Sequence, residues 1–523
     1  MNREDTNLRK SFEDFDRTES PSVALRQKIQ ADIANHDRGN GLKRLWFAGR
    51  SMELLAAALL VAVLFGAGYL ALPDRNSGSE TTSPTLTAGA ASTPVPDDLM
   101  PVMQGGSAAQ DNSFPGVIPP QASFRKLWQT DDSQPSQSGF FGTTLFVQEN
   151  THGDTATSTA LTAYEAATGT ILWQETVSTG FGFAVDKRGV YVALPAQTDT
   201  GGSGYRIALF DLRQGQPIWR TDEVFPWSSP DSFMSGTLID GDSLIFQPNI
   251  QTVVALNIAD GSERWRNTSA AADSSACSPR TCSAPPAIAD GVVYRVDPGA
   301  NQIVALAEAT GATLWAVPFL NDSQLALIAN QTAFASVQLT ATPYGALVGI
   351  SISGQAIQGQ SDFRLLGQSD GAAMWDQAYG LPGRPMSLAH NWLFLTIEGN
   401  PDDDAPRVLV IDIQTGQVLA THPFAPGDPL NVFIYLPKSN VLLGGLRSVM
   451  TSESLVQRVP GIGHLFGKGK ATATIDWLDP DTLAVIGSAD FEDCFVDRTV
   501  SSDGKIVCEN ANGNGFAVYG PKP

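Results

Sequence analysis

The chain has 523 residues, of which 33 are Lys or Arg and 54 are Asp or Glu, so its formal net charge at pH 7 is −21. Such an acidic surface disfavours nucleic acid and anionic lipid headgroups as partners, and we expect no nucleic-acid binding. The acidic excess lies after residue 50, because residues 1–50 hold ten basic and eight acidic residues. Solubility is the simplest role for this charge.

Residues 1–50 are predicted to form a cytoplasmic N-terminal segment with one short helix. The stretch SVALRQKIQADIANH places Val23, Leu25, Ile29 and Ile33 at spacings loosely suited to one helical face. A short helix, then a basic stretch and one membrane span, is similar to membrane-tethered anti-sigma factors, although their zinc motif is missing here.

Residues 51–72 are predicted to form a transmembrane helix that acts as a signal anchor. Leu54 to Leu72 contains no charged residue and would extend about 30 Å as a helix, enough to cross the hydrocarbon core. A cleaved signal peptide is the alternative, but the stretch begins more than fifty residues into the chain and no clear small-residue cleavage site follows it. Four basic residues lie between residues 38 and 50 and few follow the span, so the N-terminus is expected in the cytoplasm and the remaining chain outside the cell membrane.

Residues 73–123 are rich in Pro, Ser, Thr, Ala and Gly and poor in aromatic residues. Such a composition cannot bury enough apolar surface to fold, so we expect a flexible linker with a root-mean-square span of roughly 40 Å.

Residues 124–523 repeat one phrase six times. Its copies are LTAYEAATGTILW, IALFDLRQGQPIW, VVALNIADGSERW, IVALAEATGATLW, FRLLGQSDGAAMW and VLVIDIQTGQVLA. In each copy, apolar residues stand eight and five positions before a turn glycine, which is typical of a β-hairpin. The turn glycines are Gly169, Gly215, Gly261, Gly311, Gly371 and Gly416. Tryptophan follows four residues after the glycine in all copies but the last, where Ala420 stands in its place, and a further tryptophan lies in FRKLWQT; together these are Trp128, Trp173, Trp219, Trp265, Trp315 and Trp375.

A second, weaker phrase lies between these copies, a turn that runs into a short strand, as in DGDSLIF and DGVVYRV. With a degraded seventh phrase, WLDPDTLAVIG, the tryptophan positions number eight, the last near Ile486. Two hairpins at each position predict eight four-stranded blades, an all-β propeller over residues 124–523. The strand of Trp128 lacks its own leading strand, so the C-terminal GFAVYG is predicted to pair with it and close the ring.

The alternation of T-G-x-x-x-W with A-D-G-x-x-Y resembles the PQQ-like (quinoprotein-type) β-propeller repeat, over about the last three quarters of the chain. The resemblance implies that the tryptophans dock between neighbouring blades. The family includes quinone-dependent alcohol dehydrogenases and the lipoprotein propellers of outer-membrane protein assembly, so it fixes the fold more closely than the function.

Catalysis is not expected. The quinone dehydrogenases resembled here use an adjacent Cys–Cys disulfide and a calcium ion, and no two cysteines are adjacent in this chain. The acidic run Asp402, Asp403 and Asp404 could bind calcium, but a solvated loop is the simpler interpretation. We therefore predict no catalytic residue, no metal site and no PQQ or calcium cofactor.

Four cysteines allow two disulfides, Cys277 with Cys282 and Cys494 with Cys508, as an oxidising compartment permits. Zinc is a weak alternative, because the first pair has no histidine nearby to complete a ligand set.

Two long insertions interrupt the repeat, and the longer one, from Leu446 to Lys470, is basic and apolar within an acidic domain. We interpret it as a partner-binding loop, with a long hairpin packed on its own blade as an equal alternative. Its candidate contact residues are Arg447, Arg458, His464, Phe466, Lys468 and Lys470.

The sequence thus favours a bacterial, membrane-anchored, monomeric propeller that binds proteins as a scaffold, as the lipoprotein relatives do in envelope assembly, although it has no lipobox cysteine. A quinone-dependent oxidoreductase and a transmembrane sensor with a cytoplasmic partner remain the alternatives.

Overall fold

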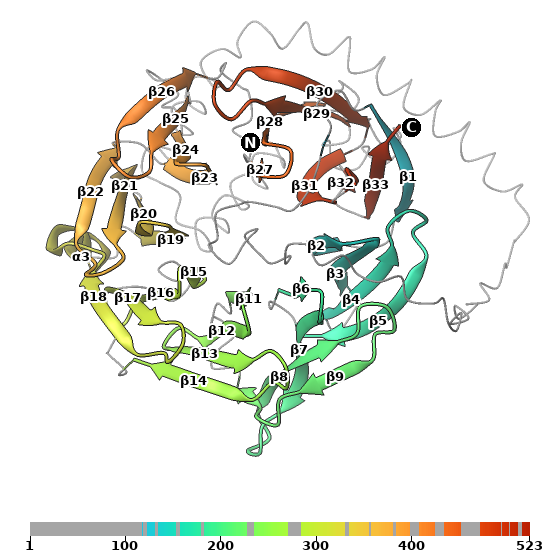
Figure 1. The fold of residues 1–523 in the computed structure, drawn as a ribbon, viewed down its shortest axis with the longest axis horizontal. Helices are drawn as coiled ribbons and strands as arrows, with labels where there is room; N and C mark the ends of the chain where they lie inside the picture. Colours follow the sequence, from blue (N-terminus) through green and yellow to red (C-terminus); the bar gives the residue numbers. More distant parts are fainter. Residues whose placement is uncertain are drawn as a thin grey trace, which may run out of the picture. The chain divides into compact units, whose positions relative to one another are not determined.

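The computed structural model describes residue 118 and residues 123–522 except 131–133, 153–156, 179–181, 227–234, 270–283, 330–333, 355–356, 380–382, 398–406, 424–433, 451–470, 493, 502 and 511–514. Its strands form eight separate antiparallel sheets, which Figure 1 shows as the blades of a ring. The predicted eight-bladed all-β propeller is confirmed.

Blades 1 to 4 follow in chain order. Blade 1 holds β2 (Gln134–Phe141), β3 (Thr144–His152), β4 (Thr157–Glu165) and β5 (Ile171–Val177). Blade 2 holds β6 (Ala184–Asp186), β7 (Gly189–Gln197), β8 (Ser203–Phe210) and an outer strand broken into β9 (Pro217–Arg220) and β10 (Phe225–Pro226). Blade 3 holds β11 (Ser235–Asp240), β12 (Ser243–Asn249), β13 (Thr252–Asn257) and β14 (Glu263–Thr268). Blade 4 holds β15 (Ala287–Ala289), β16 (Val292–Asp297), β17 (Gln302–Ala307) and β18 (Thr313–Pro318).

Blades 5 to 8 complete the ring. Blade 5 holds β19 (Phe334–Thr342), β20 (Gly345–Gly354), β21 (Ile357–Gly367) and β22 (Ala373–Tyr379). Blade 6 holds β23 (Gly383–Ala389), β24 (Trp392–Ile397), β25 (Arg407–Asp412) and β26 (Val418–Pro423). Blade 7 holds β27 (Ile434–Leu436), β28 (Val441–Met450), β29 (Ala471–Leu478) and β30 (Val485–Glu492). Blade 8 holds β31 (Cys494–Val500), β32 (Ile506–Asn510), β33 (Phe516–Pro521) and β1 (Phe124–Thr130).

Blade 8 joins the two ends of the propeller. Its outer strand, β1, pairs with the C-terminal strand β33, with Trp128 opposite Val518 and Phe124 opposite Pro521, and the blue and red strands lie side by side in Figure 1. The pairing predicted for GFAVYG is therefore present. It gives the C-terminal strand a partner on its outer side and completes a fourth strand in blade 8, so the ring is closed by the two ends of the propeller.

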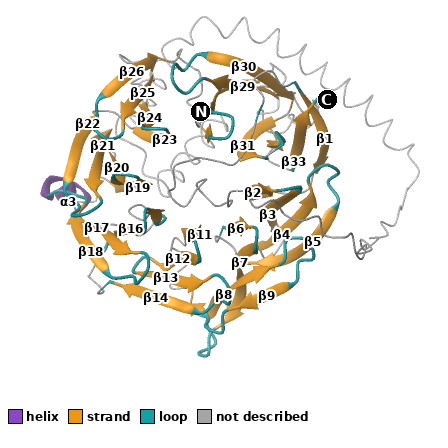
Figure 2. Cartoon of the chain, in the orientation of Figure 1, coloured by secondary structure: helices purple, strands orange, loops and turns teal. Residues whose placement is uncertain are grey.

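The single helix among the described residues is α3 (Asp322–Ala329), shown in purple in Figure 2 between blades 4 and 5. It accounts for part of the long spacing between Gly311 and Gly371. No helix in the described part of the chain is long and apolar enough to cross a membrane. The transmembrane helix predicted for residues 51–72, the N-terminal helix and most of the linker lie outside the described residues.

The outer strand of every blade carries a β-bulge one residue before the tryptophan position. In blade 4, for example, Trp315 lies opposite Ala305 and Thr313 opposite Leu306, so Leu314 is the extra residue. The same shift recurs in the other seven blades. Because a bulge twists its strand and redirects a side chain, the repeat turns the following residue toward the next blade.

The two faces of the ring carry different connections. Neighbouring strands in a blade are antiparallel, so the first-to-second and third-to-outer turns emerge on one face, which we call the turn face. The second-to-third connections and those between blades emerge on the other, which we call the loop face. Turn-face connections have two to six residues, whereas loop-face connections have one to 20.

Candidate functional site

Six tryptophans each join one blade to the next, at six of the eight seams. Each indole Nε1 donates a hydrogen bond of 2.5–3.1 Å to a backbone carbonyl in the third-to-outer turn of the following blade. The donor and acceptor residues are Trp128 and Ala166, Trp173 and Leu212, Trp219 and Ile258, Trp265 and Glu308, Trp315 and Gln368, and Trp375 and Ile413.

The turn glycines lie directly against these rings. A Cβ built on any of the six would lie 2.5–2.7 Å from an atom of the preceding blade's tryptophan, and each has φ between +62° and +74°. Only glycine satisfies both conditions, because other residues carry a Cβ and disfavour positive φ. The tryptophan and glycine therefore form one structural unit that spans two blades.

The seam between blades 6 and 7 uses a reciprocal exchange. Ala420 replaces the tryptophan, and Leu483 replaces the turn glycine with φ of 54°. Both pack against one hydrophobic cluster, which includes Tyr435 and Leu478. The leucine side chain thus fills space that an indole fills at the other seams, at the cost of a strained backbone.

The seam between blades 7 and 8 has no third-to-outer turn on which a tryptophan could dock, because the chain ends meet there. Gly487 occupies the tryptophan position, opposite Trp477. Phe124 of β1 instead stacks on Trp477 with ring centroids 6.0 Å apart. This explains why the eighth position in the sequence carries no tryptophan.

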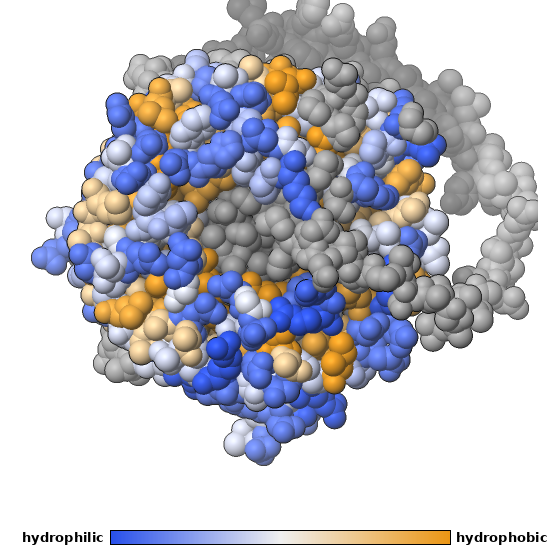
Figure 3. Space-filling view, in the orientation of Figure 1, coloured by the Kyte–Doolittle hydropathy of each residue, from blue (hydrophilic) through white to orange (hydrophobic). Residues whose placement is uncertain are grey.

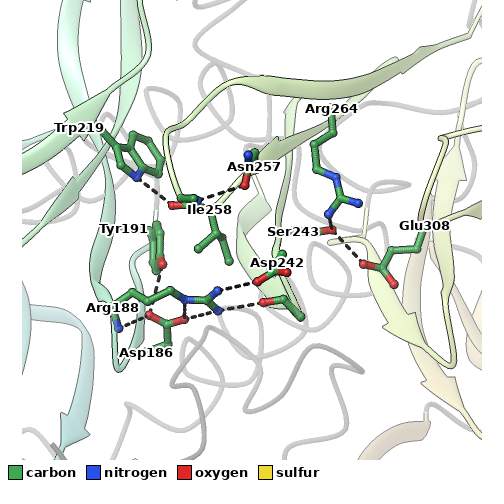
Figure 4. Close-up of polar contacts among 12 residues, drawn as sticks. Asp186, Arg188, Tyr191, Trp219, Asp242, Ser243, Asn257, Ile258, Arg264 and Glu308 are labelled. Carbon is green, nitrogen blue, oxygen red and sulfur yellow. Dashed lines mark hydrogen bonds and ion pairs between the residues drawn. The ribbon is translucent and has the colours of Figure 1, made fainter.

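Charged groups join blades 2 and 3 on the turn face (Figure 4). Arg188 donates from Nε to Asp186 at 2.7 Å, and its other nitrogens reach Asp242 at 3.2 Å and the Gly241 carbonyl at 2.8 Å. Tyr191 also donates to Asp186, at 3.2 Å. The arginine therefore bridges the turns of two blades.

A second polar contact joins blades 3 and 4 in the same view. Arg264 donates to Ser243 Oγ at 2.6 Å, and Ser243 donates to Glu308 at 2.9 Å. Burial, and after it the neighbouring Glu308 and Asp290 carboxylates, raise the pKa of Asp240. Two carboxyl groups that share a partly buried site retain a proton more readily than either would alone.

One histidine, His390, forms a group of polar contacts where blades 6 and 7 meet. The Nε2 of His390 lies 3.1 Å from the Tyr435 hydroxyl, which donates to Asn440 at 3.0 Å. The Nδ1 of His390 lies 3.7 Å from Asp481. Burial, and after it the Asp481 charge, raise the pKa of Tyr435. These contacts link turn-face residues of two blades in the manner of the arginine bridges.

One buried ion pair stands inside blade 4. Arg295 and Asp297 are almost fully buried and lie 3.2 Å apart, and Arg295 also donates to the Gln251 carbonyl of blade 3 at 3.1 Å. Burial lowers the pKa of Arg295, and Asp297 opposes that shift. Among the residues that the structure describes, no three His, Cys, Asp or Glu side chains gather in a way that could hold a metal ion.

The remaining predicted residues are placed only in part. Arg447 lies in β28, opposite Thr474 of β29, whereas Arg458, His464, Phe466, Lys468 and Lys470 lie outside the described residues, as do Cys277, Cys282 and Asp402 to Asp404. The strands that flank these three segments end on the loop face, because they are joined as second to third strands or between blades.

Cys508 of β32 is buried and disulfide-bonded. It lies opposite Val496, while Cys494 lies opposite Asn510. The two cysteines are thus on paired strands, and their pairing with each other stays a prediction.

The fold and its seams define a closed propeller of tryptophan-docked repeats. A family model described as outer membrane protein assembly factor BamB matches residues 120–276 and 203–362. Over these residues the chain is similar to the PQQ-like propeller family, as the spacing of glycine and tryptophan predicted. No curated protein matches the sequence significantly.

Several solved structures have a similar fold. Quinohemoprotein alcohol dehydrogenase ADHIIG from Pseudomonas putida HK5 shares 10% identity over 81% of each chain, with a TM-score of 0.47. The quinohemoprotein alcohol dehydrogenase of Comamonas testosteroni shares 10% over 81% of each chain, with a TM-score of 0.46. BamB from Moraxella catarrhalis shares 15% over 77% of this chain and 98% of its own, with a TM-score of 0.37. These likenesses concern the fold alone.

Sequence reasoning missed the polar seams, although one signal was present. The residue that offers its carbonyl to the tryptophan is buried and apolar in four turns, as Ala166, Leu212, Ile258 and Ile413. Glu308 stands at the same position in blade 4, so a carboxyl group at an apolar position of the repeat marked this seam.

Proposed function

We propose that this protein is a membrane-anchored, extracytoplasmic propeller that binds other proteins without catalysis and serves in the assembly of envelope proteins. The observation that carries the proposal is the match of the outer membrane protein assembly factor model to residues 120–362. The proteins that this model describes act in outer-membrane protein assembly by name, and the extension to this chain is our inference.

The arrangement of the ring supports a binding role. Docked tryptophans join six of the eight seams of the closed ring, and the connections of variable length all leave the strands on one face. Rigid scaffolds with variable loops commonly present binding surfaces. The sequence also supports a non-catalytic role, since its four cysteines include no adjacent pair.

Cofactor binding gives the decisive test. Full-length protein in detergent is titrated with pyrroloquinoline quinone and calcium by calorimetry, and dye-linked oxidation of alcohols and sugars is measured. A scaffold gives no saturable binding and no turnover, while cross-linking in intact cells yields reproducible protein partners. Saturable quinone binding with alcohol oxidation would overturn the proposal in favour of a dehydrogenase.

The anchor has its own test. A protease added to spheroplasts is expected to cut within residues 73–123 and release the propeller, while an epitope before residue 50 stays protected. A mature chain that lacks residues 1–72 by intact mass would instead establish a cleaved signal peptide.

A further inference from the structure

Exposed apolar side chains concentrate on the outer strands of two adjacent blades. The large hydrophobic residues that are most exposed in the described chain all lie on outer strands, and half of them belong to β26 and β30: Val418, Leu419, Val485 and Ile486, between 40% and 59% exposed. Figure 3 shows hydrophobic surface at the rim over these strands. We call these four residues the blade 6–7 patch.

The two halves of the patch are joined by the unusual seam beneath them. Ala420 follows Leu419 on β26, and Leu483 precedes Val485 by two residues, and both pack against the same hydrophobic cluster.

The bulge position accounts for Leu419 and Ile486 in the patch. The bulge residues of blades 2, 4 and 5 are likewise apolar and exposed, as Ile218, Leu314 and Met374. The bulge does not account for Val418 and Val485 at the starts of the two strands. Blade 1 also exposes Ile171 at this position, but its bulge residue Leu172 is only partly exposed. Among the described outer strands, those of blades 6 and 7 are therefore the ones that expose large apolar side chains at both positions.

The outer edges of these strands pair with no other strand among the residues described. An unpaired edge presents backbone donors and acceptors to an incoming strand, and proteins usually blunt such edges with charge. The outer strand of blade 3 carries Glu263, Arg264 and Arg266, and that of blade 8 carries Arg125 and Lys126. In contrast, β26 (VLATHP) carries no Asp, Glu, Lys or Arg, a property that it shares with β18 (TLWAVP) of blade 4.

The charges around the patch are negative. Asp412 is the last residue of β25, directly before the turn that leads into β26. Asp479 and Asp481 lie in the turn before β30, and Asp490 lies on β30 itself, where it is exposed. An apolar surface with an acidic border complements an apolar segment that carries Lys or Arg. A second copy of this chain, with its net charge of −21, is a poor complement.

We propose that the blade 6–7 patch binds an extended segment of a partner protein, in which apolar side chains alternate with polar ones and basic residues stand at the ends. The segment adds a strand to the edge of β26, its apolar side chains contact the patch, and its Lys or Arg residues face the aspartates. This inference rests on the proposed binding function and names the partner chemistry of one surface.

A model peptide tests the proposal. Binding of a fluorescent KVTVTVTVK peptide to full-length protein in nanodiscs is measured by anisotropy. The variant L419K/I486K is expected to bind at least tenfold more weakly, because it removes two apolar contacts and adds like charge. The matched control L314K/M374K changes the same bulge positions in blades 4 and 5, which are 49% and 46% exposed, and is expected to bind within twofold of wild type.

Two further peptides separate charge from strand pairing. EVTVTVTVE is expected to bind at least tenfold more weakly than the Lys peptide, and a Lys peptide N-methylated at each Val is expected to lose binding, because it cannot donate along one edge. Equal loss in both protein variants, or equal binding of all three peptides, would overturn the proposal. If L419K/I486K melts below wild type, V418T/V485T replaces it, and retained affinity in that folded variant would overturn the proposal as well.

Two results distinguish this inference from the proposed function. Cross-linked partners that persist in L419K/I486K, with no peptide binding to wild type, would refute the patch and leave the scaffold intact. Dimerisation of the wild-type chain that L419K/I486K abolishes would identify a second copy as the occupant and refute the partner segment.

Discussion

Exchange of the seam residues between blades 6 and 7 is expected to show strong energetic coupling. In A420W, an indole is forced against Leu483, although at the other seams even a Cβ would lie 2.5–2.7 Å from a ring atom. We expect this overpacking to destabilise the protein by about 1–3 kcal/mol. L483G loses apolar contacts but relieves positive φ, strain of about 1–2 kcal/mol, so its net cost is expected to be about 1 kcal/mol.

The double variant A420W/L483G restores the pair found at six other seams. We expect it to be more stable than the sum of the single variants by about 2 kcal/mol, within the usual range for contacting residues. Urea unfolding of the full-length proteins, followed by circular dichroism, measures the four free energies of the cycle.

The next seam supplies the reverse cycle as a control. At the seam between blades 5 and 6, a Cβ placed on Gly416 would lie 2.7 Å from the Trp375 ring. G416L alone is therefore expected to lower the free energy of unfolding more than any other variant, and W375A/G416L is expected to recover part of that loss. Additivity within about 0.3–0.5 kcal/mol in the first cycle would refute the reciprocal exchange.

Three other measurements test the polar contacts and the disulfide. The raised pKa of Asp240 means that this carboxyl group binds a proton more tightly in the folded protein than in the unfolded chain. Its contribution to stability therefore falls as the pH rises above the ordinary pKa of 3.8. In urea unfolding, D240N should gain stability relative to wild type between pH 4 and pH 7.5, and a difference that stays constant over this range would contradict the raised pKa. R295M leaves Asp297 buried without its partner and is expected to cost about 3–5 kcal/mol, whereas R295M/D297L should recover most of that loss; equal losses in both would show that the charge is not the cause. Mass spectrometry of peptides from the unreduced protein is expected to show a disulfide between Cys494 and Cys508. A disulfide from Cys508 to any other cysteine would disprove that pairing.

The fold could be predicted from the sequence because few other residues can replace the glycine and tryptophan of its repeat. A glycine with positive φ against an indole tolerates no substitution by itself, so the pair recurs at fixed spacing and marks six of the eight seams. Closure of the ring could also be predicted, because the sequence shows no strand directly before the strand of Trp128 and no outer strand after the C-terminal strand.

The seams that depart from the repeat could not be predicted, because the sequence shows there only that the tryptophan is missing, and not which residues replace its contacts. Ala420 is compensated only by the conformation and packing of Leu483, and nothing in a sequence marks a leucine as having positive φ. Likewise, the bridge from Arg188 to Asp242 depends on the distance between two turns in different blades, which a local pattern does not encode.

The division between the two faces follows from the same seams. Since each tryptophan docks on a turn of the next blade, an insertion in a third-to-outer turn would displace the carbonyl and glycine that hold the ring, and no turn-face connection exceeds six residues. In the described part of the chain, the tryptophan hydrogen bonds all end on third-to-outer turns and none on a loop-face connection. The loop-face connections reach 20 residues between β28 and β29. Variation is therefore tolerated on the loop face and at the solvent-facing positions of the outer strands, and those are the surfaces on which this chain can acquire a partner without weakening its closure.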